Sequence, residues 1–275
     1  MLGKLIKYDL RSCLRKFWVL WLALAALGVV NGLSIRYVLE SGDFRGIWMF
    51  LLGILPIILL SVLVMIIAIM ALVYICERFY KGLLGDEGYL MFTLPATTAE
   101  HIASKSIVAL ILELISGLVA VLTVFLVMVV YDAPRTLEFL GKIPAYLREI
   151  PFPRGTGWLV AETVILSLVM AVVSNLHIYQ AIAIGHLAKK HRGAWAVLAY
   201  VGINIALSIL TFMLADLGVS RFDRMFSFFF DDTGFHGAVG AISAGLGVSL
   251  LYQLILGVVF FFGTKVILDR RLNLE

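Results

Sequence analysis

Long apolar runs alternate with short polar stretches along the whole chain. A helix needs about 20 mostly apolar residues to cross the hydrocarbon core of a bilayer. Six runs reach this length, at positions 17–39, 47–76, 105–131, 157–187, 194–217 and 237–268. The pattern therefore predicts an all-α polytopic membrane protein, a single membrane domain over residues 1–275 with six transmembrane helices. Pro56 is expected to kink the second of them.

The first sixteen residues follow a different periodicity. Apolar side chains recur every four positions on one helical face, and basic side chains gather on the opposite face: Leu2, Ile6, Leu10 and Leu14 against Lys4, Lys7, Arg11 and Arg15. Such a helix lies on an anionic leaflet with its apolar face in the lipid. A segment that is basic merely because it borders a membrane is the alternative. The regular spacing favours an amphipathic interfacial helix over residues 1–16.

Composition supports a membrane location, because 62% of the residues are hydrophobic and only 15% are charged, far from the average of soluble proteins. The net charge of +4 is therefore not a sign of nucleic-acid binding, and no nucleic-acid partner is expected. With both termini inside, the inner segments hold fourteen of the 22 lysines and arginines, and the outer segments hold eight. This ratio predicts cytoplasmic termini and a cytoplasmic segment at 77–104.

Two segments are then extracellular. The first, 132–156, has apolar residues at helical spacing and is expected to form a short helix on the outer surface: Leu137, Leu140, Ile143, Tyr146 and Leu147. The second, 218–236, is rich in phenylalanine, with Phe222, Phe226, Phe228, Phe229, Phe230 and Phe235. These rings belong at a membrane interface or in a re-entrant hairpin. A role in lining a substrate path is the alternative, and anchoring or packing is favoured over it.

The cytoplasmic segment 77–104 is a shaped loop. Its first half predicts a short helix with an apolar face of Phe79, Tyr80, Leu83 and Leu84, which ends at Gly88. Its second half ends in a helix start, because Thr97 followed by Glu100 is a capping box just after Pro95. We interpret this loop as a docking surface.

Motifs for chemistry are missing from the sequence. It contains no HExxH zinc motif, no GxSxG nucleophile elbow and no GxxxxGK[ST] phosphate loop. Its five histidines are scattered, without the spacing of a metal site. No catalytic residue, no metal ligand and no enzyme activity are therefore expected of this chain.

Two acids lie inside predicted spans, Glu113 in the third and Glu162 in the fourth. A carboxylate at this depth is costly, so it faces a partner, the bundle interior or a water-filled path. A role in a substrate pathway and structural pairing remain equal alternatives for both.

The inner half of the fourth span is unusually polar, with Asn175, His177, Tyr179, Gln180 and His186. Asn175 and His177 are candidate pathway residues. Hydrogen bonds between helices are the favoured interpretation of this group.

Small residues recur every four positions in the sixth span, at Gly237, Ala241, Gly245 and Ser249. Such a face lets another helix approach closely. The partner helix can belong to the same subunit or to another.

One stretch of the cytoplasmic loop is characteristic enough to suggest a family. The loop after the second span reads RFYKGLLGDEGYLMFTLPATTAEHIASK, with the core DEGYLMFTLP at 86–95. Together with an interfacial helix and six spans, it resembles the permease subunits of bacterial type-2 ABC exporters, in particular small Gram-positive ones. The match in sequence covers this stretch alone, and the match in topology covers nearly the whole chain.

This resemblance implies a location in the bacterial cell membrane and several partners. Two permease subunits, identical or paralogous, form the pathway, and two ATPase subunits bind beneath them. ATP and Mg²⁺ are bound by the ATPase, and no cofactor is expected in this chain. The residues assigned to ATPase contact are Phe79, Tyr80, Leu83, Leu84, Asp86, Glu87, Gly88, Tyr89, Phe92 and Pro95. The loop 188–193 is a lesser contact.

The resemblance also implies a mechanism, in which closing of the ATPase dimer pushes the second and third spans through the loop. An apolar, Phe-rich pathway with few charges suits an amphipathic peptide, such as a toxin or an antimicrobial peptide. A lipid, a drug or self-protection against foreign peptides is the alternative within the family. An intramembrane enzyme and a non-transporting scaffold remain alternatives from other classes. A secondary transporter is disfavoured, because paired charges near mid-membrane are missing apart from Glu113 and Glu162.

Overall fold

The structure, a computed structural model, describes residues 2–41, 47–85, 96–149, 155–188, 190–230 and 235–271, with the backbone alone at 41, 214–230, 235–238, 241, 270 and 271. This described part is helical and contains no strand. Its elements in chain order are α1 (Leu2–Ser41), α2 (Ile47–Met49), the π-helix η1 (Phe50–Ile54), α3 (Leu55–Phe79), the π-helix η2 (Tyr80–Leu84), α5 (Thr98–Tyr131), α6 (Ala133–Glu149), α7 (Thr156–His186), α8 (Arg192–Phe230) and α9 (Phe235–Arg271).

Six helical stretches in the described residues are long and apolar enough to cross a membrane, which confirms the predicted all-α class with six candidate spans. They cover Leu2–Glu40, Ile47–Leu84, Thr98–Tyr131, Thr156–His186, Arg192–Met213 and Ile242–Asp269. Several are longer than the apolar runs in the sequence. The reason is that no proline or capping residue ends these helices where the apolar run ends, so the helix continues into polar sequence.

The N-terminal segment is helical, but it is not a separate element. α1 runs without a break from Leu2 through the predicted boundary at Lys16 to Ser41. Within it, Cys13 and Phe17 are buried, whereas the basic residues Arg11 and Arg15 are exposed. The basic side chains of this segment are therefore exposed along the first turns of α1.

The phenylalanine-rich segment is largely helical. The backbone of α8 stays helical to Phe230, through most of the segment 218–236, whose rings were expected at a membrane interface or in a re-entrant hairpin. Gly218 alone is a weak helix breaker, at a cost of about 1 kcal/mol, and no proline occurs between Arg192 and Phe230. The phenylalanine side chains of this segment lie outside the described residues.

The chain divides into two compact units. The first unit comprises Met1–Leu2, Ile75–Leu110 and Phe152–Glu275, and the second comprises Gly3–Tyr74 and Ile111–Pro151. Helices α3 and α5 contribute to both units.

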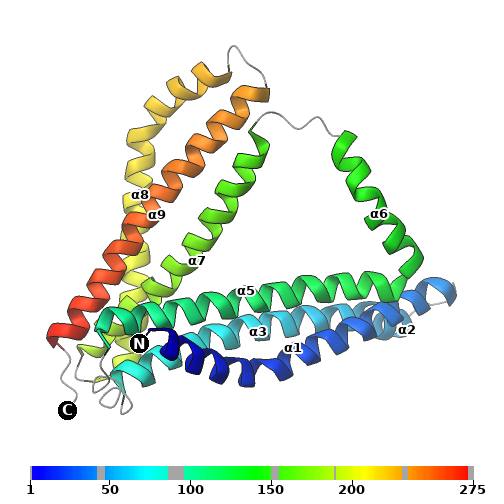
Figure 1. Ribbon diagram of the computed structural model, residues 1–275, viewed down its shortest axis with the longest axis horizontal. Helices are drawn as coiled ribbons and strands as arrows, with labels where there is room; N and C mark the ends of the chain where they lie inside the picture. Colours follow the sequence, from blue (N-terminus) through cyan, green and yellow to red (C-terminus); the bar gives the residue numbers. More distant parts are fainter. Residues whose placement is uncertain are drawn as a thin grey trace. The chain divides into compact units, whose positions relative to one another are not determined.

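Close helix packing and buried hydrogen bonds hold the second unit together, in which α1 lies beside α3 and α5 (Figure 1). An alanine Cβ at Gly28 would lie 2.7 Å from Thr123 Cγ2, and one at Gly32 would lie 2.6 Å from Val130 Cβ. Only glycine permits this approach of α1 to α5. The buried Asn31 side chain donates a hydrogen bond of 2.7 Å to the carbonyl oxygen of Pro56.

The irregularity expected at Pro56 takes the form of a π-helix. η1 ends two residues before Pro56, and it precedes the regular helix α3. Proline has no N–H for the carbonyl four residues earlier, so a local change of helix type is one way to re-pair the backbone.

The first unit contains α7, α8 and α9 lying side by side (Figure 1). α7 and α9 run parallel, because Gly257 of α9 packs on Val173 and Gly263 packs on Gln180. α7 and α8 form a hairpin at Gly185, where a Cβ would lie 2.4 Å from the backbone nitrogen of Ala196. Glycines in this unit therefore again mark where two helices touch.

We expect Gly32→Ala to lower the free energy of unfolding by about 1–3 kcal/mol, because the new methyl group collides with Val130 and forces α1 away from α5. The measurement is a thermal melt of the purified protein in detergent. Gly117→Ala in α5 is the matched control, since nothing lies within 4 Å of its added Cβ. Equal melting temperatures for the two variants would contradict the close approach.

Candidate functional site

The predicted docking loop connects two helix ends, residues 79–85 at the end of the second span and residues 97–102 at the start of α5. We call these two helix ends the base of the loop. At the first end, α3 changes into the π-helix η2, and the N–H of Gly85 donates a hydrogen bond of 2.9 Å to the carbonyl oxygen of Tyr80, five residues back. Single π-helical turns are frequent at functional sites. Gly82 lies on the buried side, where an added Cβ would be 3.1 Å from Lys105 Nζ of α5.

The other side of the base is the start of α5. The predicted capping box is confirmed: the Thr97 N–H donates to Glu100 Oε2 at 2.8 Å, and the Glu100 N–H donates to Thr97 Oγ1 at 3.3 Å. The two bonds satisfy backbone donors that a helix start leaves unpaired. The loop therefore re-enters regular helix at a defined residue.

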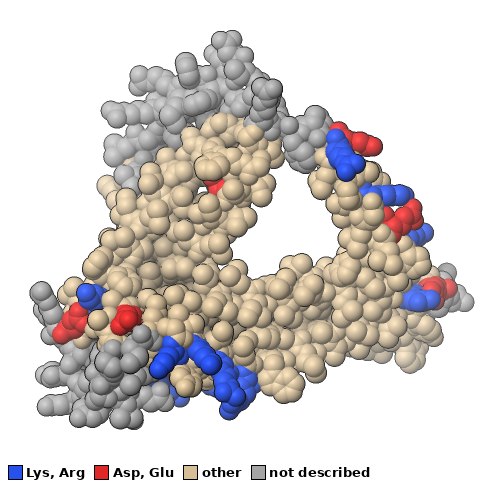
Figure 2. Space-filling model, in the orientation of Figure 1, with Lys and Arg blue, Asp and Glu red and all other residues tan. Residues whose placement is uncertain are grey.

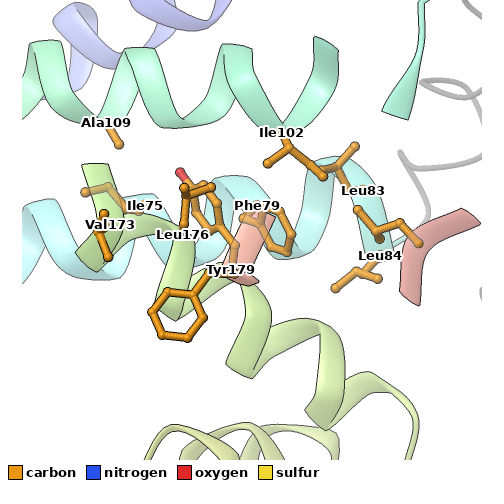
Figure 3. Close-up of a cluster of buried hydrophobic side chains, with 11 residues drawn as sticks. Ile75, Phe79, Leu83, Leu84, Ile102, Ala109, Val173, Leu176 and Tyr179 are labelled. Carbon is orange, nitrogen blue, oxygen red and sulfur yellow. The ribbon is translucent and has the colours of Figure 1, made fainter. Parts of the chain in front are cut away.

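A buried apolar cluster connects this base to α7 and α9 (Figure 3). The rings of Phe79 and Tyr179 are stacked, with centroids 4.2 Å apart and an interplanar angle of 6°. Ile102 of α5 and Leu268 of α9 belong to the same cluster. Close packing of this kind transmits displacement from one element to its neighbours.

Two further contacts bring helix ends to the base. Tyr80 meets His186 of α7 edge to face at a centroid distance of 6.0 Å, and the Thr98 hydroxyl donates a hydrogen bond to Asp269 of α9. The ends of α3, α7 and α9 and the start of α5 thus meet. An alternation of six spans puts the same four ends on one side of a membrane.

Burial changes the role of three residues that were assigned to partner contact. Phe79 and Leu83 are fully buried and Leu84 is 5% exposed, all of them enclosed by the chain itself. They are core residues of the base and present no surface to another protein in this conformation. Tyr80 is 37% exposed and remains available. The remaining residues of that assignment, Asp86, Glu87, Gly88, Tyr89, Phe92 and Pro95, lie outside the described part of the chain.

The loop 188–193, which was predicted to be a lesser contact, follows a turn at the end of α7. Backbone N–H groups of Leu187 and Ala188 donate to the carbonyl oxygens of Ile184 and Gly185, and His191 has a positive φ of 55°. The turn follows His186 directly, so it adjoins the residue that Tyr80 contacts.

Polar side chains of α7 are buried or half-buried, and four of them each have one polar atom for which the expected hydrogen bond between helices is not found among the described residues. Asn175 is 1% exposed and His177 is 7% exposed. Within the described residues, no hydrogen-bond partner exists for Asn175 Nδ2, His177 Nε2, Gln180 Oε1 and His186 Nδ1. Buried polar atoms are normally paired with protein or water, so these four mark places where water or a ligand group can bind.

Aromatic rings enclose His177 on both faces. Its ring is stacked on Tyr200 of α8, with centroids 4.5 Å apart, and on Phe260 of α9, with centroids 4.8 Å apart. Gln180 packs beside Gly263 on the same side of α7. His177 and Gln180 therefore both lie on the face of α7 that is turned toward α9. Their spacing of three residues allows two side chains to share one face of a helix.

The two acids belong to different units. Glu162 lies on α7, the helix that carries Asn175 and His177, and its Oε2 is buried with no hydrogen-bond partner among the described residues. Glu113 lies half-buried on α5 in the second unit, and this residue takes part in a polar interaction with another group. The described residues contain no group of three or more histidines, cysteines, aspartates or glutamates that could hold a metal ion.

The predicted small-residue face of α9 makes no close helix contact at Gly245, where an added Cβ would meet nothing within 4 Å. Ser249 donates a hydrogen bond to the carbonyl oxygen of Gly245 in its own helix, and the side-chain surroundings of Gly237 and Ala241 lie outside the described residues. The close approaches of α9 are at Gly257 and Gly263 instead. Sequence reasoning also missed Gly28 and Gly32, although their four-residue spacing is the same signal.

No protein-family model matches the chain, and no curated protein or solved structure gives a significant match.

We expect Phe79→Ala to destabilise the protein by about 3 kcal/mol or more, because it removes a buried aromatic side chain from the base and leaves a cavity. Tyr80→Ala, at the neighbouring and partly exposed position, should cost much less. Thermal melts in detergent measure both. A Phe79→Ala variant as stable as the Tyr80→Ala variant would show that Phe79 is not a core residue.

Asn175→Leu is expected to leave the melting temperature unchanged or to raise it, because an apolar side chain of similar size replaces an unpaired buried amide nitrogen. Asn31→Leu is the matched control, since Asn31 is equally buried but donates to Pro56. It should cost about 1 kcal/mol. Equal losses for both variants would mean that Asn175 has a structural partner.

Proposed function

We propose that this chain is the permease subunit of an ATP-driven type-2 ABC exporter in a bacterial cell membrane, and that it moves amphipathic substrates, above all peptides. Two copies of a separate ATPase bind it from the cytoplasm, and those copies bind ATP and Mg²⁺. A second permease subunit, identical or paralogous, completes the pathway. The N-terminal turns of α1 lie at the inner leaflet, where their exposed basic residues meet anionic lipid headgroups.

The observation that carries this proposal is the anchored base of the loop 86–95. The loop leaves from η2 and returns at the capped start of α5, and both are packed against α7 and α9 through Phe79, Tyr179 and Leu268. A force on the loop is therefore transmitted to four packed helices, the end of the second span, α5, α7 and α9. The sequence of the loop resembles that of type-2 exporter permeases, and this resemblance supports an ATPase as the source of the force.

In this mechanism the ATPase dimer closes on ATP and pushes the loop. Tyr80 and Lys81 are exposed at its root, and the acidic pair Asp86 and Glu87 supplies charge for docking. Coupling requires that the two conformations of the permease bind the ATP-loaded dimer with different affinity. The base provides this coupling, because a displacement of the loop would also displace the helices that are packed against its base.

The polar atoms of α7 supply contacts for the substrate. Asn175, His177 and Glu162 carry buried polar atoms without partners among the described residues, and they lie along one span. A peptide backbone or a lipid headgroup would form hydrogen bonds with these atoms. The polar groups of such a substrate would therefore lose less free energy on entering this bundle than on entering a fully apolar one. A lipid or a drug is the alternative substrate.

The test is co-expression of the chain with the ATPase encoded beside it, followed by purification in detergent and an assay of ATP hydrolysis in nanodiscs. We expect Asp86→Lys combined with Glu87→Lys to reduce the amount of co-purified ATPase about tenfold or more, because reversed charges at a docking surface cost several kcal/mol. The permease itself should still insert and melt normally.

A matched control reverses two charges elsewhere, with Glu138→Lys and Glu149→Lys on the exposed polar face of α6. This pair should leave ATPase recovery unchanged. Equal recovery with both double variants, or purification of the folded chain without any ATPase, would refute the proposal.

A further inference from the structure

Helix α6 is divided lengthwise into an apolar half and a polar half. Successive residues of a helix are rotated by about 100°, which puts the large apolar side chains on one half and all the charged ones on the other. The apolar half carries Leu137, Phe139, Leu140, Ile143, Tyr146 and Leu147, and the polar half carries Arg135, Glu138, Lys142, Arg148 and Glu149. Figure 2 shows positive and negative side chains alternating along the surface of this helix.

The apolar half has no cover within the described part of the chain. Leu137 is 62% exposed, and Phe139, Tyr146 and Leu147 are each at least half exposed. Thr136 is the buried residue of this helix. Such a face needs an apolar environment from outside the chain, because exposed apolar surface of this size marks an interaction site.

The start of α6 is tied to the end of a span. Asp132 alone separates α5 from α6, and its Oδ1 accepts a hydrogen bond of 3.0 Å from the Arg135 N–H. The Thr136 hydroxyl bonds back to the carbonyl oxygens of Met128 and Asp132. This turn leaves no linker, so α6 begins where α5 reaches the membrane surface.

The same helix is unsuited to lie within the hydrocarbon. Its 17 residues span about 25 Å, it carries five charged side chains, and it is not one of the six candidate spans. Pro144 within it has no N–H for the carbonyl oxygen of Leu140. A helix with this many charged side chains is costly to place in the hydrocarbon core.

We propose that α6 lies in the lipid–water interface, with its apolar half in the acyl boundary of the bilayer and its polar half toward water. Since α5 alone crosses the membrane between Thr98 and Tyr131, α6 lies on the side opposite to the loop 86–95. The occupant of the apolar face is phospholipid. The preceding span α5 also exposes apolar side chains to the lipid, among them Leu118, Val121 and Phe125.

A second copy of the chain fits this face less well. One half of α6 is about 25 Å long and about 10 Å wide, which amounts to a few hundred Å² of contact. A stable protein interface buries roughly 800 Å² on each partner. The basic residues Arg135, Lys142 and Arg148 also suit phosphate headgroups beside the apolar half.

Site-specific fluorescence tests this placement. In a Cys13→Ala and Cys76→Ala background, Leu140→Cys and Glu138→Cys are labelled with an environment-sensitive dye and reconstituted in phosphatidylcholine–phosphatidylglycerol nanodiscs. The two positions lie within one turn of each other on opposite halves of α6. We expect the label at 140 to be quenched several-fold more by lipids with a shallow acyl spin label, and the label at 138 several-fold more by aqueous iodide.

Leu147→Cys and Ala145→Cys repeat the comparison two turns later, in case one labelled variant does not fold. Equal access of iodide to both halves would overturn the proposal in favour of a water-exposed helix. A label at 140 or 147 that neither quencher reaches would overturn it in favour of a protein partner. Neither result bears on ATPase binding, so the exporter proposal is tested separately.

Discussion

The structure depends on one constraint: hydrocarbon offers no hydrogen-bond partner to a peptide group. Each crossing must therefore satisfy its own backbone, and the six candidate spans are all helices. The departures from regular helix occur where the backbone has a particular reason to change. η1 precedes Pro56, and η2 leads into the extended residue Gly85, where the chain leaves the helix.

Helices in a bilayer gain little from the hydrophobic effect between them, so contact geometry and polar pairing decide the packing. Gly28 and Gly32 let α1 touch α5, and Gly257 and Gly263 let α9 touch α7. Asn31 is paired with a backbone carbonyl, whereas Asn175 is equally buried with an unpaired amide nitrogen. Two equally buried asparagines therefore differ in whether their amide nitrogen contributes a hydrogen bond to the packing.

The base of the loop links packing to the proposed coupling. The stacking of Phe79 on Tyr179 connects the base to α7, and the hydrogen bond from Thr98 to Asp269 connects it to α9. The helix that carries the unpaired polar atoms is thus the helix on which the loop is anchored. Under the exporter proposal, one rigid contact connects the ATPase to the part of the pathway that meets substrate.

The sequence by itself determined the class, the number of spans and the capping box of Thr97 and Glu100, because hydrophobic length and local backbone pairing depend on neighbouring residues alone. It also indicated the helix at Leu137–Leu147, whose division into two halves is a matter of spacing. Tertiary structure decided which faces are covered. Phe79, Leu83 and Leu84 had the spacing of a docking face, but residues far along the chain bury them. The same holds for His177, whose stacking on Tyr200 and Phe260 follows from how α7, α8 and α9 pack and not from local sequence.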